Sequence, residues 1–139
     1  MNDDQIQQQL RVIFLEEAAS LLEEFERYLL ELEGTADRAG TITRIFRVAH
    51  SLKGSGASVG FNGLAGFAHT VEDCLTVLRA KPECVESCVI SLLLETLDIK
   101  KIWVAGLKSE ADSYLGPPGV KILQGRIQAL TKLLEGKGA

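Results

Sequence analysis

A helical repeat of apolar residues runs without a break from about residue 3 to residue 33, and it constrains the fold more than any other feature. The apolar side chains recur at intervals of three and four, which is the period of one face of an α-helix: Ile6, Leu10, Ile13, Phe14, Leu21, Leu22, Phe25, Tyr28, Leu29 and Leu32. The opposite face is rich in glutamate and suits solvent. The segment therefore predicts one long amphipathic helix with a single apolar side to bury.

The same period returns in four later segments, which predict helices at about 41–57, 62–80, 83–114 and 119–135. Glycine and proline punctuate the connections, and Asn62 is expected to cap the third helix. No segment shows the alternation of a strand. Connections of roughly 3 to 8 residues favour antiparallel neighbours. The sequence thus predicts an all-α protein, an up-and-down antiparallel four-helix bundle with an additional C-terminal fifth helix, forming one domain over 1–135 with a frayed tail at 136–139.

Composition narrows the classes of partner. The formal net charge of −4 argues against nucleic acid or an anionic membrane surface, since both select basic proteins. No apolar run approaches the ~18 to 20 residues of a membrane span, and the acidic start does not resemble a secretion signal. Three cysteines in such a chain predict reduced thiols. We expect a cytoplasmic protein that is monomeric as an isolated domain.

His50 is the residue that packing needs least. On a helical wheel of roughly 100° per residue, it falls nearly opposite the apolar stripe of the second predicted helix. Its neighbours on that outer face are Arg47, Lys53 and Gly54. Two cations and an absent side chain suit a nucleophile that accepts an anionic group and presents it to another protein, because cations stabilise phosphoryl oxygens and glycine removes bulk.

Motifs of autonomous enzymes are missing. The glycine-rich run at 54–60 lacks both the G-x-G-x-x-G spacing and a preceding strand, and no G-x-x-x-x-G-K-[ST] occurs. Neither G-x-S-x-G nor H-E-x-x-H is present. The sequence therefore predicts no active site that works on its own.

Three groups of residues resemble the histidine phosphotransfer family. They are the segment 46–55 (FRVAHSLKGS), the pair Gly60-Phe61, and the segment 69–73 (HTVED). The similarity extends to 14–18 and 94–99, so it covers nearly the whole chain, and it is strongest to the amino-terminal domain of chemotaxis histidine kinases of the CheA family.

The resemblance implies a role for each matching residue. His50 would be the phosphoacceptor at Nε2, and Glu72 would hold the other ring nitrogen and so fix the tautomer. Lys53 would meet the phosphoryl charge, Gly54 would clear the approach, and His69 would have a tuning role. Family members receive phosphate from ATP through a separate kinase domain and pass it to an aspartate of a response-regulator receiver domain. The implied partners are those two domains, with no cofactor in this chain.

Two other functions remain open at this stage. A helical bundle can bind metal through histidine and glutamate, and His50, His69 and Glu72 could converge, although the His-x-x-Glu order is the reverse of the usual one. Cys84 and Cys88, four apart on a predicted helix, could share a metal, but no second cysteine pair accompanies them. A helical interaction module without phosphotransfer is the other alternative. The sequence does not identify the kinase or the receiver.

Overall fold

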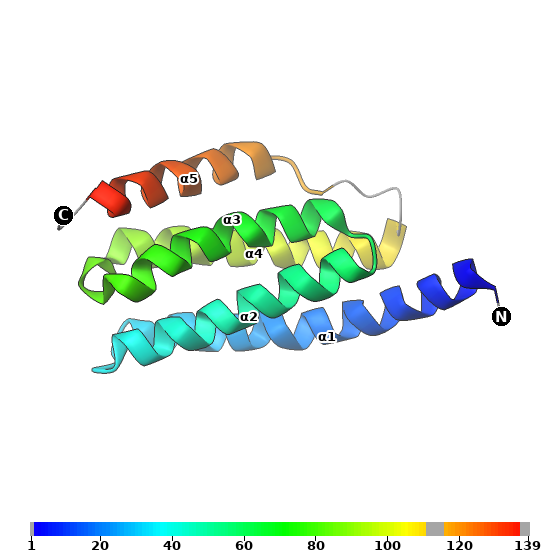
Figure 1. Ribbon diagram of the computed structural model, residues 1–139, viewed down its shortest axis with the longest axis horizontal. Coiled ribbons are helices and arrows are strands. Elements are labelled where there is room, and N and C mark those ends of the chain that lie inside the picture. The colour runs from blue at the N-terminus through cyan, green and yellow to red at the C-terminus, as the bar shows by residue number, and fades with distance from the viewer. Residues whose placement is uncertain (1, 111–115, 137–139) are drawn as a thin grey trace.

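Four long helices, each antiparallel to the one before, form the body of the molecule in a computed structural model that describes residues 2–110 and 116–136 (Figure 1). They are α1 (Asp3–Leu32), α2 (Arg38–Ser58), α3 (Asn62–Ala80) and α4 (Ser87–Glu110), with a short 3₁₀ turn η1 (Pro82–Cys84) before α4. A fifth helix, α5 (Val120–Gly136), lies along α3 on the outside of the bundle. The described residues contain no strand. The predicted fold class is confirmed.

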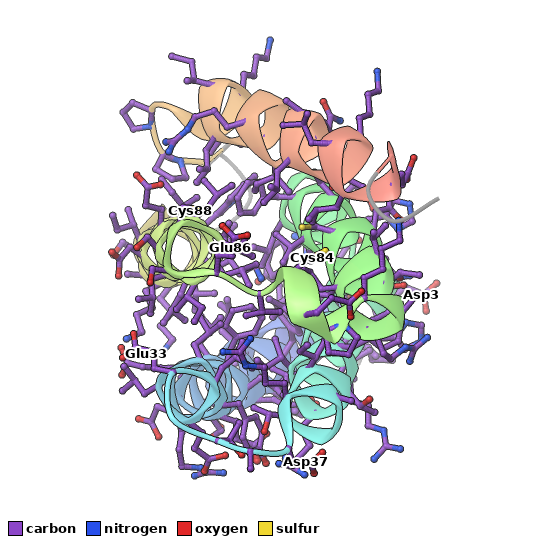
Figure 2. The ribbon with its side chains drawn as sticks, turned by 90° about the vertical axis from the view of Figure 1, so that its left-hand side faces the viewer. Asp3, Glu33, Asp37, Cys84, Glu86 and Cys88 are labelled. Atoms are coloured by element: carbon purple, nitrogen blue, oxygen red, sulfur yellow. The ribbon has the colours of Figure 1, made fainter. Side chains whose placement is uncertain are left out.

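The end-on view places α1 to α4 at four corners around the core, with α5 above them (Figure 2). All five helices contribute to one continuous apolar interior, in which Phe25 and Phe67 are among the largest fully buried side chains. None of the described helices combines the length and the apolar character that crossing a membrane requires. Because the core uses only one face of α2, the opposite face of that helix stays available for a site.

The N-terminal part of α1 extends past the bundle. Ile6, Leu10 and Ile13, which the helical period assigned to the core, are 43%, 45% and 59% exposed. Figure 1 shows this end of α1 reaching beyond its neighbours, so no helix covers the apolar side of its first turns. Ile13 differs, because Phe14 next to it is only 2% exposed: the core reaches this level, and Ile13 lies on the side of α1 away from it. Ile122 and Leu133 of α5 are also exposed, at 74% and 66%, because α5 packs mainly on α3.

Three predicted helix boundaries need correction. α2 begins at Arg38, because the Asp37 carboxylate accepts a hydrogen bond from the Gly40 N–H at 3.0 Å and caps the helix earlier than expected. Asn62 is the first helical residue of α3 and makes no capping hydrogen bond. α4 begins at Ser87, since the residues after Lys81 form the 3₁₀ turn. The predicted end of the fourth helix and the last three residues lie outside the described residues.

The cysteines are free thiols that lie in three environments. Cys74 is buried in α3, Cys84 is half-buried in η1, and Cys88 is exposed in α4. The 3₁₀ turn therefore separates the two that were expected to share a helix.

The turn between α2 and α3 is tied to α1. The side chains of Gln7 and Arg11 both donate hydrogen bonds to the carbonyl of Val59, at 2.7 and 2.8 Å. Gly60 follows in the left-handed region with φ of 87°, which favours glycine. Phe61 then packs on Phe14, with ring centroids 5.7 Å apart. These contacts attach the turn between α2 and α3 to α1.

A lysine lies inside the bundle. Lys100 of α4 is completely buried, and its Nζ has no hydrogen-bond partner among the described residues. Nζ lies 4.2 Å from the ring centroid of Phe25 in α1. Burial lowers the pKa of Lys100 from 10.5 to about 7, because the charged form loses its hydration.

Candidate functional site

His50 stands on the outer face of α2, as the helical period predicts. The helix buries Ile45, Val48, Ala49 and Leu52 on its inner side. The His50 side chain is 62% exposed on the other side. Its imidazole is therefore open to a second protein.

Glu72 of α3 links His50 to Lys53. The His50 Nδ1 lies 3.1 Å from Glu72 Oε2, and the Lys53 Nζ lies 3.0 Å from Oε1 and 2.9 Å from Oε2. Glu72 is only 9% exposed, because it lies where α3 packs on α2. The three side chains form one hydrogen-bonded cluster across two helices.

The protonation of Glu72 follows from its surroundings. Burial raises the pKa of its carboxyl group. The hydrogen bonds and charges of Lys53 and His50 together lower the pKa by more than burial raises it, so the net pKa lies below the usual value. An ionised carboxylate can only accept hydrogen bonds, and a neutral imidazole facing it must carry its proton on Nδ1. The lone pair of His50 is then on Nε2, the nitrogen away from Glu72.

Two further side chains lie beside the cluster, Phe46 of α2 and Arg79 of α3. The Phe46 ring lies nearly parallel to the His50 ring, with an interplanar angle of 12° and centroids 6.1 Å apart. The guanidinium carbon of Arg79 lies 4.2 Å from the centroid of Phe46. Neither residue was predicted to lie at the site, although the i−4 spacing of Phe46 from His50 could have indicated the first contact.

A shallow groove of about 310 Å³ lies between α1 and α2. Tyr28 of α1 and Arg44 and Arg47 of α2 line part of this groove. Arg44 lies over the Tyr28 ring, with its guanidinium carbon 5.6 Å from the centroid. Arg44 and Arg47 thus place two cations on the α1 side of α2, opposite Glu24 of α1, while Lys53 lies on the α3 side with Glu72.

Gly54 lies one turn after His50 on the same outer face. A Cβ atom built at Gly54 would meet no other atom within 4 Å. Packing inside this protein therefore does not require glycine at this position.

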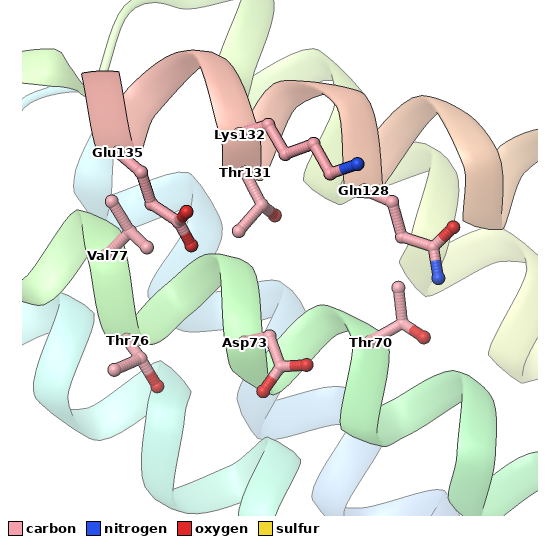
Figure 3. A pocket seen from close by; sticks show the side chains of 8 residues that line it. All are labelled: Thr70, Asp73, Thr76, Val77, Gln128, Thr131, Lys132 and Glu135. Carbon is pink, nitrogen blue, oxygen red and sulfur yellow. The ribbon is translucent and has the colours of Figure 1, made fainter. Parts of the chain in front are cut away.

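His69 is placed apart from the cluster. It is exposed on α3, and its Nε2 lies 3.6 Å from Oδ2 of Asp73. Asp73 lines a groove of about 560 Å³ between α3 and α5, where it lies on the same side of α3 as Thr70 and across from Thr131 of α5 (Figure 3). Among the described residues no contact joins His69 to His50 or Glu72, so the tuning role stays a prediction.

A metal site finds no support in the geometry. Within residues 2–110 and 116–136, no three His, Cys, Asp or Glu side chains gather in a way that could hold a metal ion. In the cluster around His50, the oxygens of Glu72 are occupied by Lys53 and by the imidazole.

Comparison with known proteins gives consistent matches. The Hpt domain family model matches residues 9–100. The chain is 36% identical over 108 residues to the chemotaxis protein CheA of Borreliella burgdorferi, covering 78% of this chain and 12% of that protein. It is 40% identical over 101 residues to CheA of Klebsiella aerogenes, covering 73% and 14%. The chain therefore spans only a small part of the curated relatives that it matches.

A solved structure has the same fold. The phosphorylated P1 domain of CheA3 from R. sphaeroides, in complex with CheY6, aligns with a TM-score of 0.78 and 20% sequence identity. The alignment covers 91% of this chain and 98% of that one.

Proposed function

The chain belongs to the Hpt domain family, and from this we propose that it is the phosphotransfer domain of a chemotaxis histidine kinase, with His50 as the phosphoryl carrier. The observation that carries the proposal is the hydrogen bond of 3.1 Å between Nδ1 of the exposed His50 and the carboxylate of Glu72. It leaves the Nε2 lone pair directed away from the protein. The partners are a kinase ATP-binding domain and response-regulator receiver domains, in the cytoplasm.

The geometry supports two transfers in sequence. In the first, the Nε2 lone pair attacks the γ-phosphorus of ATP held by the separate kinase domain, so that an N–P bond forms and the P–O bond to ADP breaks. In the second, a receiver aspartate oxygen attacks the same phosphorus, and the N–P electron pair returns to the imidazole. The chain itself supplies the relay residue, while ATP is bound elsewhere.

Glu72 and Lys53 have complementary roles in these steps. The imidazole gains positive charge as the N–P bond forms, and the Glu72 carboxylate on Nδ1–H stabilises that charge. Lys53 keeps Glu72 ionised through its contact of 2.9 Å, and its partly exposed ammonium is available to phosphoryl oxygens.

A labelling and chase experiment tests the proposal. The protein is incubated with a chemotaxis kinase ATP-binding domain and radiolabelled ATP, and an isolated receiver domain is then added. We expect acid-labile, base-stable phosphate on the chain that leaves within the chase. A chain that takes up no label with a panel of such kinase domains is instead a helical interaction module.

Removing the carboxylate of Glu72 is expected to slow labelling. Glu72→Ala should reduce the rate by about 10- to 100-fold, because the tautomer and the orientation of His50 lose their support. Asp73→Asn is the matched control, since this neighbouring carboxylate is exposed and contacts His69 rather than His50. If Glu72→Ala is labelled as fast as wild type, the assigned role of this carboxylate is wrong.

Bulk at Gly54 is expected to obstruct the partners and leave the fold intact. Gly54→Ala should stabilise α2 by about 1 kcal/mol in thermal or urea unfolding, because alanine is the better helix former and its Cβ meets nothing. Gly54→Leu should slow both transfers by about tenfold or more, because the partner can no longer align its reacting atoms. Gly66→Leu is the control, as Gly66 of α3 is equally open. Equal transfer rates in both leucine variants would remove the access role of Gly54.

A further inference from the structure

The face of the His50 ring has a partner that the proposed function does not use. Phe46 precedes His50 by one helical turn on α2, and the two rings are nearly parallel at 12°. The ring centroids are 6.1 Å apart, within the roughly 4.5 to 7 Å at which aromatic pairs interact. Phe46 is half-buried and packs against the core, so its ring is anchored on one side.

A second helix fixes the same ring. Arg79 of α3 places its guanidinium carbon 4.2 Å from the centroid of Phe46, within the range of a cation–π contact. Phe46 is thus contacted by His50 from its own helix and by Arg79 from the helix that carries Glu72. This makes the Phe46 ring a flat surface whose orientation depends on both helices.

A single hydrogen bond does not fix an imidazole. The bond from Nδ1 to Glu72 holds one edge of the ring, but the ring can still tilt about that contact. An aromatic face beside it limits the tilt. We propose that Phe46, held by Arg79, is a positioning residue that orients the His50 ring so that Nε2 is aimed for phosphoryl transfer.

The consequence for the reaction is one of alignment. Transfer to Nε2 requires its lone pair to point at the phosphorus, and small errors of orientation reduce rates strongly. Phe46 does not touch the reacting atoms in this arrangement. It acts through His50, so the turnover should change more than the affinity for the kinase domain.

The inference rests on the proposed function, and its test has a readout that is independent of phosphorylation. Phe46→Leu keeps apolar volume but removes the ring, while Phe46→Tyr keeps the ring. Nitrogen NMR of the His50 imidazole reports its tautomer, and labelling kinetics with a chemotaxis kinase domain report kcat and KM. For Phe46→Leu we expect a larger share of the Nε2–H tautomer and a kcat lowered about two- to tenfold, the range expected from losing a stacked aromatic contact, with KM unchanged. Phe46→Tyr should keep both the tautomer ratio and kcat at their wild-type values.

Arg79→Gln provides a second variant at an exposed position, and it should shift the tautomer and kcat in the same direction by a smaller factor. It decides the question if Phe46→Leu does not fold. Wild-type values of tautomer and kcat in a folded Phe46→Leu protein would overturn the inference, as would a change in KM alone. If no variant and no wild-type protein is labelled but the tautomer still depends on Phe46, the proposed function fails while the positioning of the ring stands.

Discussion

The His50→Gln protein is expected to take up no phosphate. Labelling by a kinase domain and ATP should fall from about one phosphate per chain to background, because glutamine has no nucleophilic nitrogen to form the N–P bond. His50 is 62% exposed and contributes little to the core, so the melting temperature should change little. Phosphate stoichiometry by intact-protein mass spectrometry and circular dichroism check the two statements.

His69→Gln is the matched control for that experiment. His69 is also an exposed histidine, but it contacts Asp73 and not the cluster around Glu72. The His69→Gln protein should therefore reach the wild-type stoichiometry. Label on the His50→Gln chain equal to that on wild type would show that another residue is the acceptor.

Replacing the buried lysine is expected to stabilise the protein. The folded state holds Lys100 with a pKa of about 7, against 10.5 in the unfolded chain. Well below pH 7, Lys100 is protonated in both the folded and the unfolded state, and well above pH 10.5 it is neutral in both. The free energy of unfolding is therefore lower at the acidic limit by roughly 4 to 5 kcal/mol. Lys100→Met removes this term and keeps similar volume, so urea unfolding at pH 7 should give a free energy higher by about 2 to 4 kcal/mol.

The burial of Lys100 also predicts how the free energy of unfolding changes with pH. Between pH 7 and pH 10 the unfolded chain binds a proton at Lys100 that the folded chain does not, so wild-type stability should rise with pH in this window. The difference between Lys100→Met and wild type should shrink accordingly. Lys101→Met is the control, because Lys101 pairs with Glu26 at the surface and should change stability by less than about 1 kcal/mol. A stability gap that is constant over this window would contradict a neutral buried Lys100.

Helical periodicity predicted the position of His50, because the exposure of this residue depends on a single helix. The exposure of His50 follows from its angle to the apolar stripe of α2, and that is a local property of the sequence. The contacts of Glu72 and Arg79 depend on the register of α3 against α2, which no local pattern specifies. The resemblance to a known family supplied Glu72, but nothing in the sequence indicated that Arg79 would lie over Phe46.

The extent of the core also depends on contacts between helices, which explains the mistaken assignments of Ile6, Leu10 and Lys100. A helical period says which side of a helix is apolar but not how far its neighbours extend, so Ile6 and Leu10 were placed in a core that ends before them. Lys100 was missed for the converse reason. It lies on the stripe that includes Leu97 and Val104, and only its charge argued against burial.

The anchoring of Val59 to α1 has a consequence for dynamics. The carbonyl that accepts the hydrogen bonds of Gln7 and Arg11 lies at the end of α2, just before the turn into α3. Unwinding of α1 through Gln7 and Arg11 would remove both hydrogen bonds and leave the turn between α2 and α3 without this tie to α1. The turn that joins the helix of His50 to the helix of Glu72 should therefore gain hydrogen-exchange protection from the first turns of α1, some 40 residues before His50 in sequence.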